Sequence, residues 1–182
     1  MLSEKNRHRN SKRKGDLMVE NQQKIDQFKS DILSLCMNKK LQRSKFYDYF
    51  FLLEESLTKH FNMEHCFLFH VSENNLKPID NLELLNVDVA LDLIQPYFNG
   101  NKVVKLPGFL KEQPYFENHT DVMPLIINDK IEAIIIFKYN PVGAPIQTVL
   151  TEEIVGAISA SYKYLIQKYE VYSNEQKYRK LY

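Results

Sequence analysis

The chain has 182 residues, of which 44% are hydrophobic, and its 24 basic residues nearly balance its 23 acidic ones. This length and composition fit one globular domain with helical extensions. A formal net charge of +1 excludes proteins whose whole surface binds a polyanion. No apolar run approaches the roughly 18 residues of a membrane-spanning helix, and no signal-peptide pattern begins the chain, so we expect a cytoplasmic protein without stable membrane insertion.

The N-terminal region is first basic and then amphipathic. Residues 1–16 hold six Lys or Arg against two acids, a composition typical of a disordered, solvated tail. Contact with anionic lipid or nucleic acid is the alternative, but no aromatic residues are interleaved for base stacking, so we expect no nucleic-acid partner. Residues 17–43 are predicted to be an N-terminal helical segment, because apolar residues recur there at spacings of three and four. This stripe consists of Ile25, Phe28, Ile32 and Leu35.

A second amphipathic helix is predicted before the first strand, with Ser44 as its N-cap. Its apolar stripe consists of Phe46, Phe50, Leu53 and Leu57. The apolar run 65–71 then predicts a central strand, and turn residues separate it from a short return strand over 76–79.

Residues 88–119 have the least regular pattern. They predict a short helix over 88–95, which Pro96 ends, and a short strand over 102–106. No periodicity follows from Pro107 to His119, a stretch that holds two prolines, one glycine and three aromatic residues. A long loop of this kind often lines a functional site, although its aromatic side chains can equally pack back on the sheet.

Residues 120–139 predict an antiparallel hairpin. Two apolar, β-branched runs flank Asn128 and Asp129, which tolerate the positive φ of a tight turn. A helix then begins near Thr148 or Thr151, either of which can cap it, and runs to the end of the chain. Its last third is polar, so we expect residues 170–182 to be a connector to a downstream domain.

The predicted strands are apolar on both faces, so both faces need a cover. In the first strand, Cys66, Leu68 and His70 share one face, while Phe67, Phe69 and Val71 share the other. We expect the N- and C-terminal helices to cover one face, and the short helix with the long loop to cover the other. The second cover seals imperfectly, which favours a small-molecule cavity there.

The candidate ligand-binding residues lie on or near that loosely covered face. His119 and Asp121, an imidazole and a carboxylate at a strand end, can bind a polar ligand, or they can be solvated strand-end residues. His70 can contact a ligand or serve as a hydrogen-bonded structural histidine. The full candidate set is Phe69, His70, Tyr97, Phe109, Tyr115, Phe116, His119, Asp121 and Met123.

No catalytic motif is present. The chain lacks GxSxG, P-loop and GxGxxG patterns, and its five histidines lack metal-ligand spacing, so we expect no catalytic residue, metal or cofactor. Cys36 and Cys66 match neither a CxxC motif nor a zinc pattern, and their apolar contexts predict buried, reduced thiols.

Three segments carry a resemblance to the GAF domain family: Met123-Pro124-Leu125, the strand Ala133 to Phe137, and the helix beginning TEEIVGAISASYKYLI. The order of elements from about Ser44 to Tyr169 also resembles that family. The resemblance implies an α+β fold, with a GAF-like antiparallel sheet between two unlike covers. It also implies a ligand pocket on one face, a homodimer formed through the flanking helices, and a regulatory role. The predicted sensor domain spans 44–169.

Several family activities do not fit these residues. The NKxnFxxxDE signature of cyclic-nucleotide-binding members is absent, no cysteine sits where bilin-binding relatives need one, and the 109–119 loop lacks the cysteines of the methionine-sulfoxide reductases. The C-terminal segment EVYSNEQKYRKLY is similar to the connectors that join such sensors to a further sensor or an output domain in bacterial signalling proteins. The chain's composition, rich in Lys, Asn and Ile, is similar to that of GAF-containing diguanylate cyclases. The leading hypothesis is therefore a small-molecule-sensing dimerisation module that regulates an attached output domain. The alternatives are a purely structural dimerisation domain with a self-filled pocket, and a small redox enzyme that uses Cys66.

Overall fold

The protein is described by a computed structural model that covers residues 2–37, 46–61, 63–78, 89–112, 116, 119–139 and 151–181. Its elements are α1 (Leu2–Met37), α2 (Phe46–Phe61), β1 (Met63–Ser72), β2 (Asn75–Pro78), β3 (Val89–Ala90), α3 (Leu91–Ile94), η1 (Gln95–Tyr97), β4 (Val104–Lys105), α4 (Gly108–Lys111), β5 (His119–Ile127), β6 (Lys130–Tyr139) and α5 (Glu152–Leu181). None of the helices in these ranges is long and apolar enough to cross a membrane.

A six-stranded antiparallel sheet, in the order β3-β2-β1-β6-β5-β4, forms the centre of the fold. The predicted hairpin is confirmed as β5–β6. Asn128 and Asp129 join its strands with φ angles of 50° and 62°, the left-handed backbone that a two-residue turn requires. Glu73 and Asn74 make the same kind of turn between β1 and β2, with φ angles of 51° and 65°.

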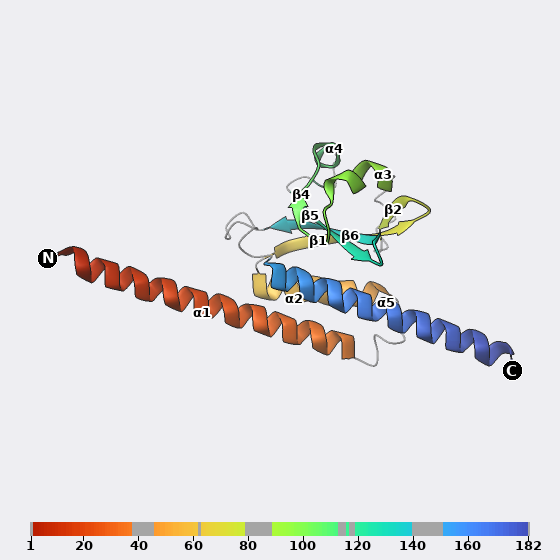
Figure 1. Ribbon diagram of the computed structural model, residues 1–182, viewed down its shortest axis with the longest axis horizontal. Helices are drawn as coiled ribbons and strands as arrows, with labels where there is room; N and C mark the ends of the chain where they lie inside the picture. The colour runs from red at the N-terminus through yellow and green to blue at the C-terminus, as the bar shows by residue number, and fades with distance from the viewer. Residues whose placement is uncertain are drawn as a thin grey trace.

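The sheet lies between two unlike covers, as Figure 1 shows. Helices α2 and α5 lie under one face, and the short helices α3 and α4 lie over the other. One buried apolar cluster joins the sheet to the long helices, and a second joins it to the α3–α4 side. The expected α+β class with an antiparallel sheet is therefore confirmed.

Helix α1 forms an additional layer, outside α2 and α5. It runs parallel to α5, because Lys29 pairs with Glu153 near the start of α5, and Cys36 lies beside Ser161 further along. The two helices are offset along their length, so α1 projects from one end of the domain and α5 from the other (Figure 1). The chain therefore enters and leaves the domain on parallel helices that project from its opposite ends.

Three local expectations differ from the structure. Residues 2–16 belong to α1 and do not form a separate tail, since the good helix formers Lys, Arg and Glu are frequent there and Gly15 alone does not break the helix. The helix expected over 88–95 is shorter, because residues 89–90 are in strand β3. The 107–119 stretch contains the single turn α4. Ser44, Thr148 and residues 38–43 and 182 lie outside the described residues.

The exit helix begins at Glu152, directly after Thr151. The Thr151 carbonyl accepts a hydrogen bond from the Val155 amide at 3.1 Å. Thr151 is therefore the residue directly before the helix, as expected. Its hydroxyl has no hydrogen-bond partner among the described residues, so the side chain does not act as a cap there.

Candidate functional site

The aromatic residues expected to line a cavity on the α3–α4 side are packed against one another. Phe69, on β1, and Phe116 are 0% and 1% exposed, and their ring centroids lie 5.7 Å apart in an edge-to-face arrangement. The ring centroids of Phe67 and Phe116 lie 5.9 Å apart, also in an edge-to-face arrangement. Such pairs stabilise the fold beyond the area that they bury. The Phe116 ring therefore occupies space that a ligand would need.

Tyr97 and Phe109 form a separate pair further out on the same side. Their ring centroids lie 6.2 Å apart, and Tyr97 is 51% exposed. Leu93, on α3, is 58% exposed nearby in the chain. Tyr97 therefore belongs to the surface of the domain and does not join the buried cluster around Phe69.

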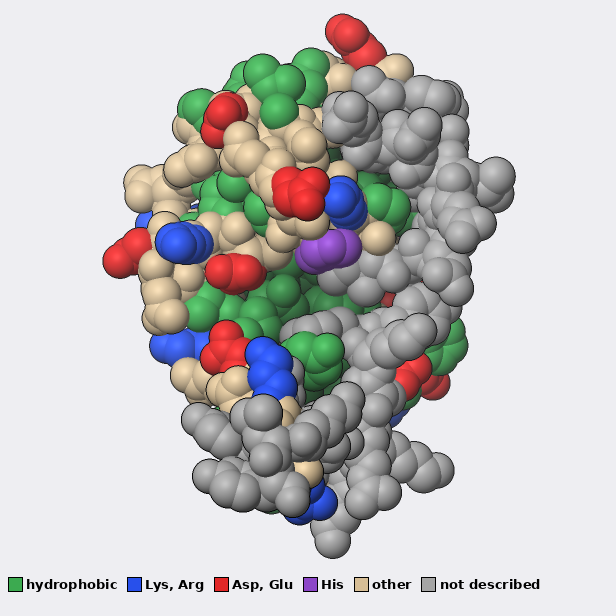
Figure 2. Space-filling view, turned by 90° about the vertical axis from the view of Figure 1, so that its right-hand side faces the viewer, with side chains coloured by type: hydrophobic (Ala, Val, Ile, Leu, Met, Phe, Trp, Pro, Cys, Tyr) green, Lys and Arg blue, Asp and Glu red, His purple; other side chains and the backbone are tan. Residues whose placement is uncertain are grey.

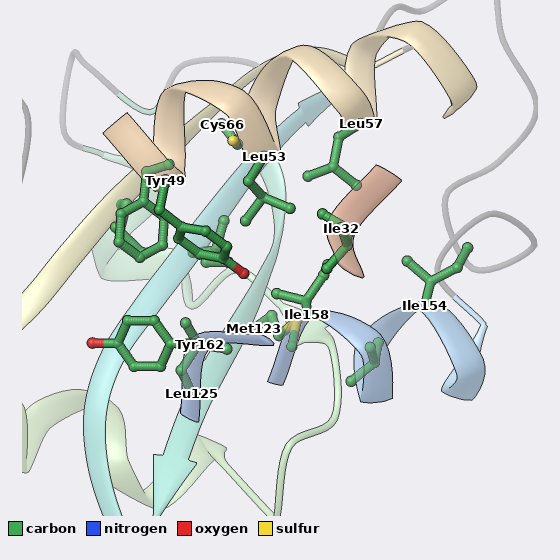
Figure 3. Close-up of a cluster of buried hydrophobic side chains, with 14 of the residues drawn as sticks. Ile32, Tyr49, Leu53, Leu57, Cys66, Met123, Leu125, Ile154, Ile158 and Tyr162 are labelled. Atoms are coloured by element: carbon green, nitrogen blue, oxygen red, sulfur yellow. The ribbon is translucent and has the colours of Figure 1, made fainter. Parts of the chain in front are cut away.

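His70, Asp121 and Met123 lie on the opposite face of the sheet from Phe69. Met123 is fully buried in the cluster that joins the sheet to α2 and α5, beside Leu125 and Ile158 (Figure 3). Strand alternation places His70 on the face of Leu68, and Asp121 on that of Met123. The nine candidate residues therefore do not line one pocket. Tyr115 lies outside the described residues, and of His119 only the backbone, at the start of β5, is described.

His70 has the surroundings of a structural histidine. Partial burial lowers the pKa of its ring, and the charge of Lys77 on the neighbouring strand lowers it further. The neutral imidazole is therefore favoured at physiological pH.

Figure 2 shows hydrophobic side chains open to view at one end of the molecule, with charged side chains and a histidine around them.

Asp121 is a buried carboxylate with a cation partner. It is 2% exposed, and its Oδ1 accepts a hydrogen bond from Lys105 Nζ at 2.9 Å. The pKa of Tyr139 is raised, first by burial and then by the negative charge of Asp121. The ion pair between β4 and β5 satisfies a charge that burial would otherwise penalise.

A buried polar contact joins three helices under the sheet. The hydroxyl of Tyr49, on α2, meets that of Ser161, on α5, and Ser161 also donates to the Ile158 carbonyl at 2.8 Å. The Sγ atom of Cys36, on α1, lies 3.8 Å from the carbonyl oxygen of Ser161 and donates to it. Burial raises the pKa of Tyr49, so its hydroxyl stays protonated. Next to this contact, the rings of Phe50 and Tyr162 lie 5.7 Å apart, so α2 packs on α5 through adjacent residues.

A cavity of about 80 Å³ lies between α2 and the sheet. Its α2 wall includes Phe50, Phe51 and Glu54, and its floor includes Cys66 and Leu68 of β1. We name it the α2–β1 cavity. Phe51, which lines it, is 60% exposed.

Glu54 holds the rim of this cavity in place. Its Oε1 accepts the backbone amide of Cys66 at 3.1 Å and contacts Nδ1 of His65. Among the described residues, the register of β1 with β2 runs from Phe69 to Ser72, so Cys66 lies before it. The Glu54 carboxylate therefore links α2 to the backbone of β1.

Both cysteines are buried thiols, as expected, with Cys36 5% and Cys66 8% exposed. Among the described side chains, no group of three His, Cys, Asp or Glu residues is placed to hold a metal ion.

No protein-family model and no curated protein sequence matches the chain. Among solved structures it is similar to the GAF domain of A. aeolicus nlh2 in an inactive state, at 15% identity and a TM-score of 0.52, covering 83% of this chain and 98% of that one. It is also similar to the GAF domain of the Acinetobacter phosphoenolpyruvate-protein phosphotransferase, at 10% identity and a TM-score of 0.53, covering 78% and 91%. The fold is GAF-like. The resemblance seen in the sequence therefore holds at the level of the fold.

Within this GAF-like fold, sequence reasoning missed Glu54 and the cavity beside it. Glu54 lies one turn before the apolar Leu57 on an amphipathic helix, where a carboxylate is ordinarily a solvated surface residue. Its role depends on a backbone amide of a different element, the strand β1, which no spacing in the chain reveals. The exposed ring of Phe51 was the one available signal, because a large aromatic residue is uncommon on the polar face of a helix.

Proposed function

We propose that the chain is a homodimeric, small-molecule-sensing module that regulates a signalling domain attached after α5, with a diguanylate cyclase as the candidate output. The parallel pair of α1 and α5 carries this proposal, because the two helices project from opposite ends of the domain (Figure 1). The packed surface of these two helices is continuous, so a change at a segment before the domain can reach a segment after it.

The outer surface of this pair is apolar where two copies can meet. On α1, Leu33 is 64% and Met37 67% exposed, and their spacing of four places them on one side of the helix. Both lie on the part of α1 that packs along α5, because Cys36 between them contacts Ser161. Tyr164 on α5 is 38% exposed. A run of exposed apolar side chains of this kind favours a protein interface, and a two-fold axis along the helices buries the same patch on both copies.

Helix α2 provides the route from the sheet to α5. It packs on β1 on one side and reaches α5 through Tyr49 with Ser161 and through Phe50 with Tyr162. A ligand that shifts α2 therefore changes the position of α5. It does so only if it binds one arrangement of these helices more tightly than the other.

One observation favours a second candidate function. Phe69 and Phe116 fill the space between the sheet and the α3–α4 side with their own rings, which supports a purely structural dimerisation domain. The redox-enzyme alternative has less support, since a reactive thiol needs exposure and Cys66 is 8% exposed.

Sedimentation equilibrium of the full chain tests the dimer. We expect a dimer for the wild type and a monomer for the Leu33→Glu/Met37→Glu double variant, because each dimer would bury four unpaired carboxylates at its interface. Leu93→Glu is the matched control, since Leu93 is 58% exposed on α3, on the other side of the sheet. A monomeric wild type, or equal weakening by the Leu93 variant, contradicts the proposal.

A further inference from the structure

We propose that the α2–β1 cavity binds a small organic ammonium ion, with its charge at Glu54 and its short alkyl chain against the sheet. The site lies on the face of the sheet that α2 and α5 cover, opposite the face on which the sequence predicts a ligand pocket. This inference rests on the proposed sensing function, and it names the ligand class and the place of binding.

The chemistry of the cavity wall selects a cation. Glu54 supplies a carboxylate to the lining of the cavity, and the aromatic residues Phe50 and Phe51 of the same helix also line it. A carboxylate with aromatic rings is the combination that proteins use for ammonium groups, because the carboxylate accepts the N–H donors and the ring faces attract the charge. An anion would face the repulsion of Glu54, and a wholly apolar ligand would further desolvate this carboxylate without adding a hydrogen-bond donor to those of Cys66 and His65.

The floor of the cavity limits the size of the ligand. Leu68 and Ile135 contribute aliphatic side chains, and Cys66 contributes a thiol. The volume of about 80 Å³ is roughly half of the ~150 Å³ of an engineered cavity that holds benzene. This space suits a chain of about four non-hydrogen atoms, such as n-propylammonium, and excludes a nucleotide.

The position of the cavity links binding to the helix that leaves the domain. Phe50 lines the cavity and also contacts Tyr162 of α5, with ring centroids 5.7 Å apart. The next residue along α2 toward its start, Tyr49, contacts Ser161. A ligand that moves Phe50 therefore acts on α5 through one shared side chain, without passing through the sheet.

The Cys66 amide provides a direct readout of binding. It donates to Glu54 Oε1 at 3.1 Å, so an ammonium ion that shares this carboxylate changes the amide's environment. We would titrate the ¹⁵N-labelled full chain with n-propylammonium chloride and follow amide shifts at constant ionic strength. The expected result is a saturable shift of Cys66 with a Kd on the order of 1 mM, in keeping with so small a ligand.

Two variants and two other ligands make the test specific. Glu54→Gln keeps an acceptor for the Cys66 amide but removes the charge, and it should weaken binding about tenfold or more. Phe51→Leu keeps apolar bulk without a ring and should weaken binding about two- to fivefold. Tyr97→Leu removes an exposed ring on the opposite face and should leave the Kd unchanged. The neutral isostere 1-propanol and the anion propionate should not saturate the site.

Two results overturn the inference: no saturable shift up to about 50 mM n-propylammonium, or equal shifts with 1-propanol. Sedimentation of the same samples separates this failure from that of the proposed function. A dimer that does not bind the ammonium ion contradicts only the inference. A monomeric chain that binds it contradicts the dimer and leaves the binding site in place.

Discussion

The hydroxyl groups of Tyr49 and Ser161 meet in the buried core beneath the sheet, and they tie α2 to α5. Both residues are almost fully buried, at 1% and 6% exposure, and Figure 3 shows Tyr49 among the apolar side chains of this cluster. A polar contact in such surroundings fixes one relative position of the two helices, because sliding either helix leaves a buried hydroxyl without a partner.

This contact predicts non-additive mutations. Ser161→Ala should lower the free energy of unfolding by about 1–3 kcal/mol, because the Tyr49 hydroxyl remains buried and unpaired. Tyr49→Phe should cost about 1 kcal/mol, and the double variant should cost at least about 0.5 kcal/mol less than the sum. Urea unfolding measures all three. Ser159→Ala is the control, because the Ser159 hydroxyl has no hydrogen-bond partner among the described residues. Additive costs would show that the two hydroxyls do not interact.

The attachment of α1 should weaken in acid. Asp31 accepts hydrogen bonds from His60 at 2.8 Å and Lys59 at 3.2 Å, both on α2. The hydrogen bond from His60 is the main reason that the pKa of Asp31 falls from 3.8 to about 2. Since the native pKa lies below the unfolded value, the carboxylate stabilises the fold above about pH 4, and this stabilisation is lost as the pH falls toward 2.

Asp31→Asn tests this pH dependence. The wild type should lose about 1–2 kcal/mol more stability than this variant between pH 5 and pH 2, a range that allows for solvent screening of a partly exposed pair. Asp26→Asn is the matched control, because Asp26 is exposed on the same helix. Superimposable acid unfolding curves for the wild type and Asp31→Asn would count against the α1–α2 contact.

The self-filled pocket predicts a defined cavity mutant. Phe116→Ala removes a buried ring that packs against both Phe67 and Phe69, so it should cost about 3–5 kcal/mol of unfolding free energy. Benzene should then raise the Tm of this variant in a concentration-dependent way and leave the wild type unchanged. Tyr97→Ala should cost less than about 1 kcal/mol, because Tyr97 is half exposed. Stabilisation of the wild type by benzene would mean that the pocket is already open.

The two thiols should differ in their reaction with a small reagent. Cys66 lines the α2–β1 cavity, whereas Cys36 lies between α1 and the Ser161 carbonyl. Methyl methanethiosulfonate should therefore modify Cys66 at least about threefold faster than Cys36, since a cavity admits a reagent without local unfolding. Peptide mass mapping of timed samples measures both rates. Equal rates would show that both thiols react only through opening of the fold.

The sequence predicted local structure well where the pattern was strictly local. Asn128 and Asp129 specify their turn directly, and the pairs Ile127–Lys130 and Ile126–Ile131 follow from it. Beyond them, a register shift between Leu125 and Ile126 changes the pairing of β5 with β6. Strand alternation also placed His70 with Leu68 correctly. Alternation along a strand tells which side chains share a face of the sheet. It does not tell which helices pack on that face. The predicted site therefore combined Phe69 with Met123, which lie on opposite faces.

Hydroxyl-radical footprinting of the full chain tests the dimer at α1–α5 most directly. The measurement compares side-chain oxidation at protein concentrations of about 1 μM and about 200 μM, which shift a reversible dimer by mass action. The account predicts that Leu33 and Met37 become protected at the higher concentration, while Leu93 and Tyr97 remain equally reactive. Unchanged oxidation of Leu33 and Met37 in a sample that sedimentation shows to be dimeric would contradict it.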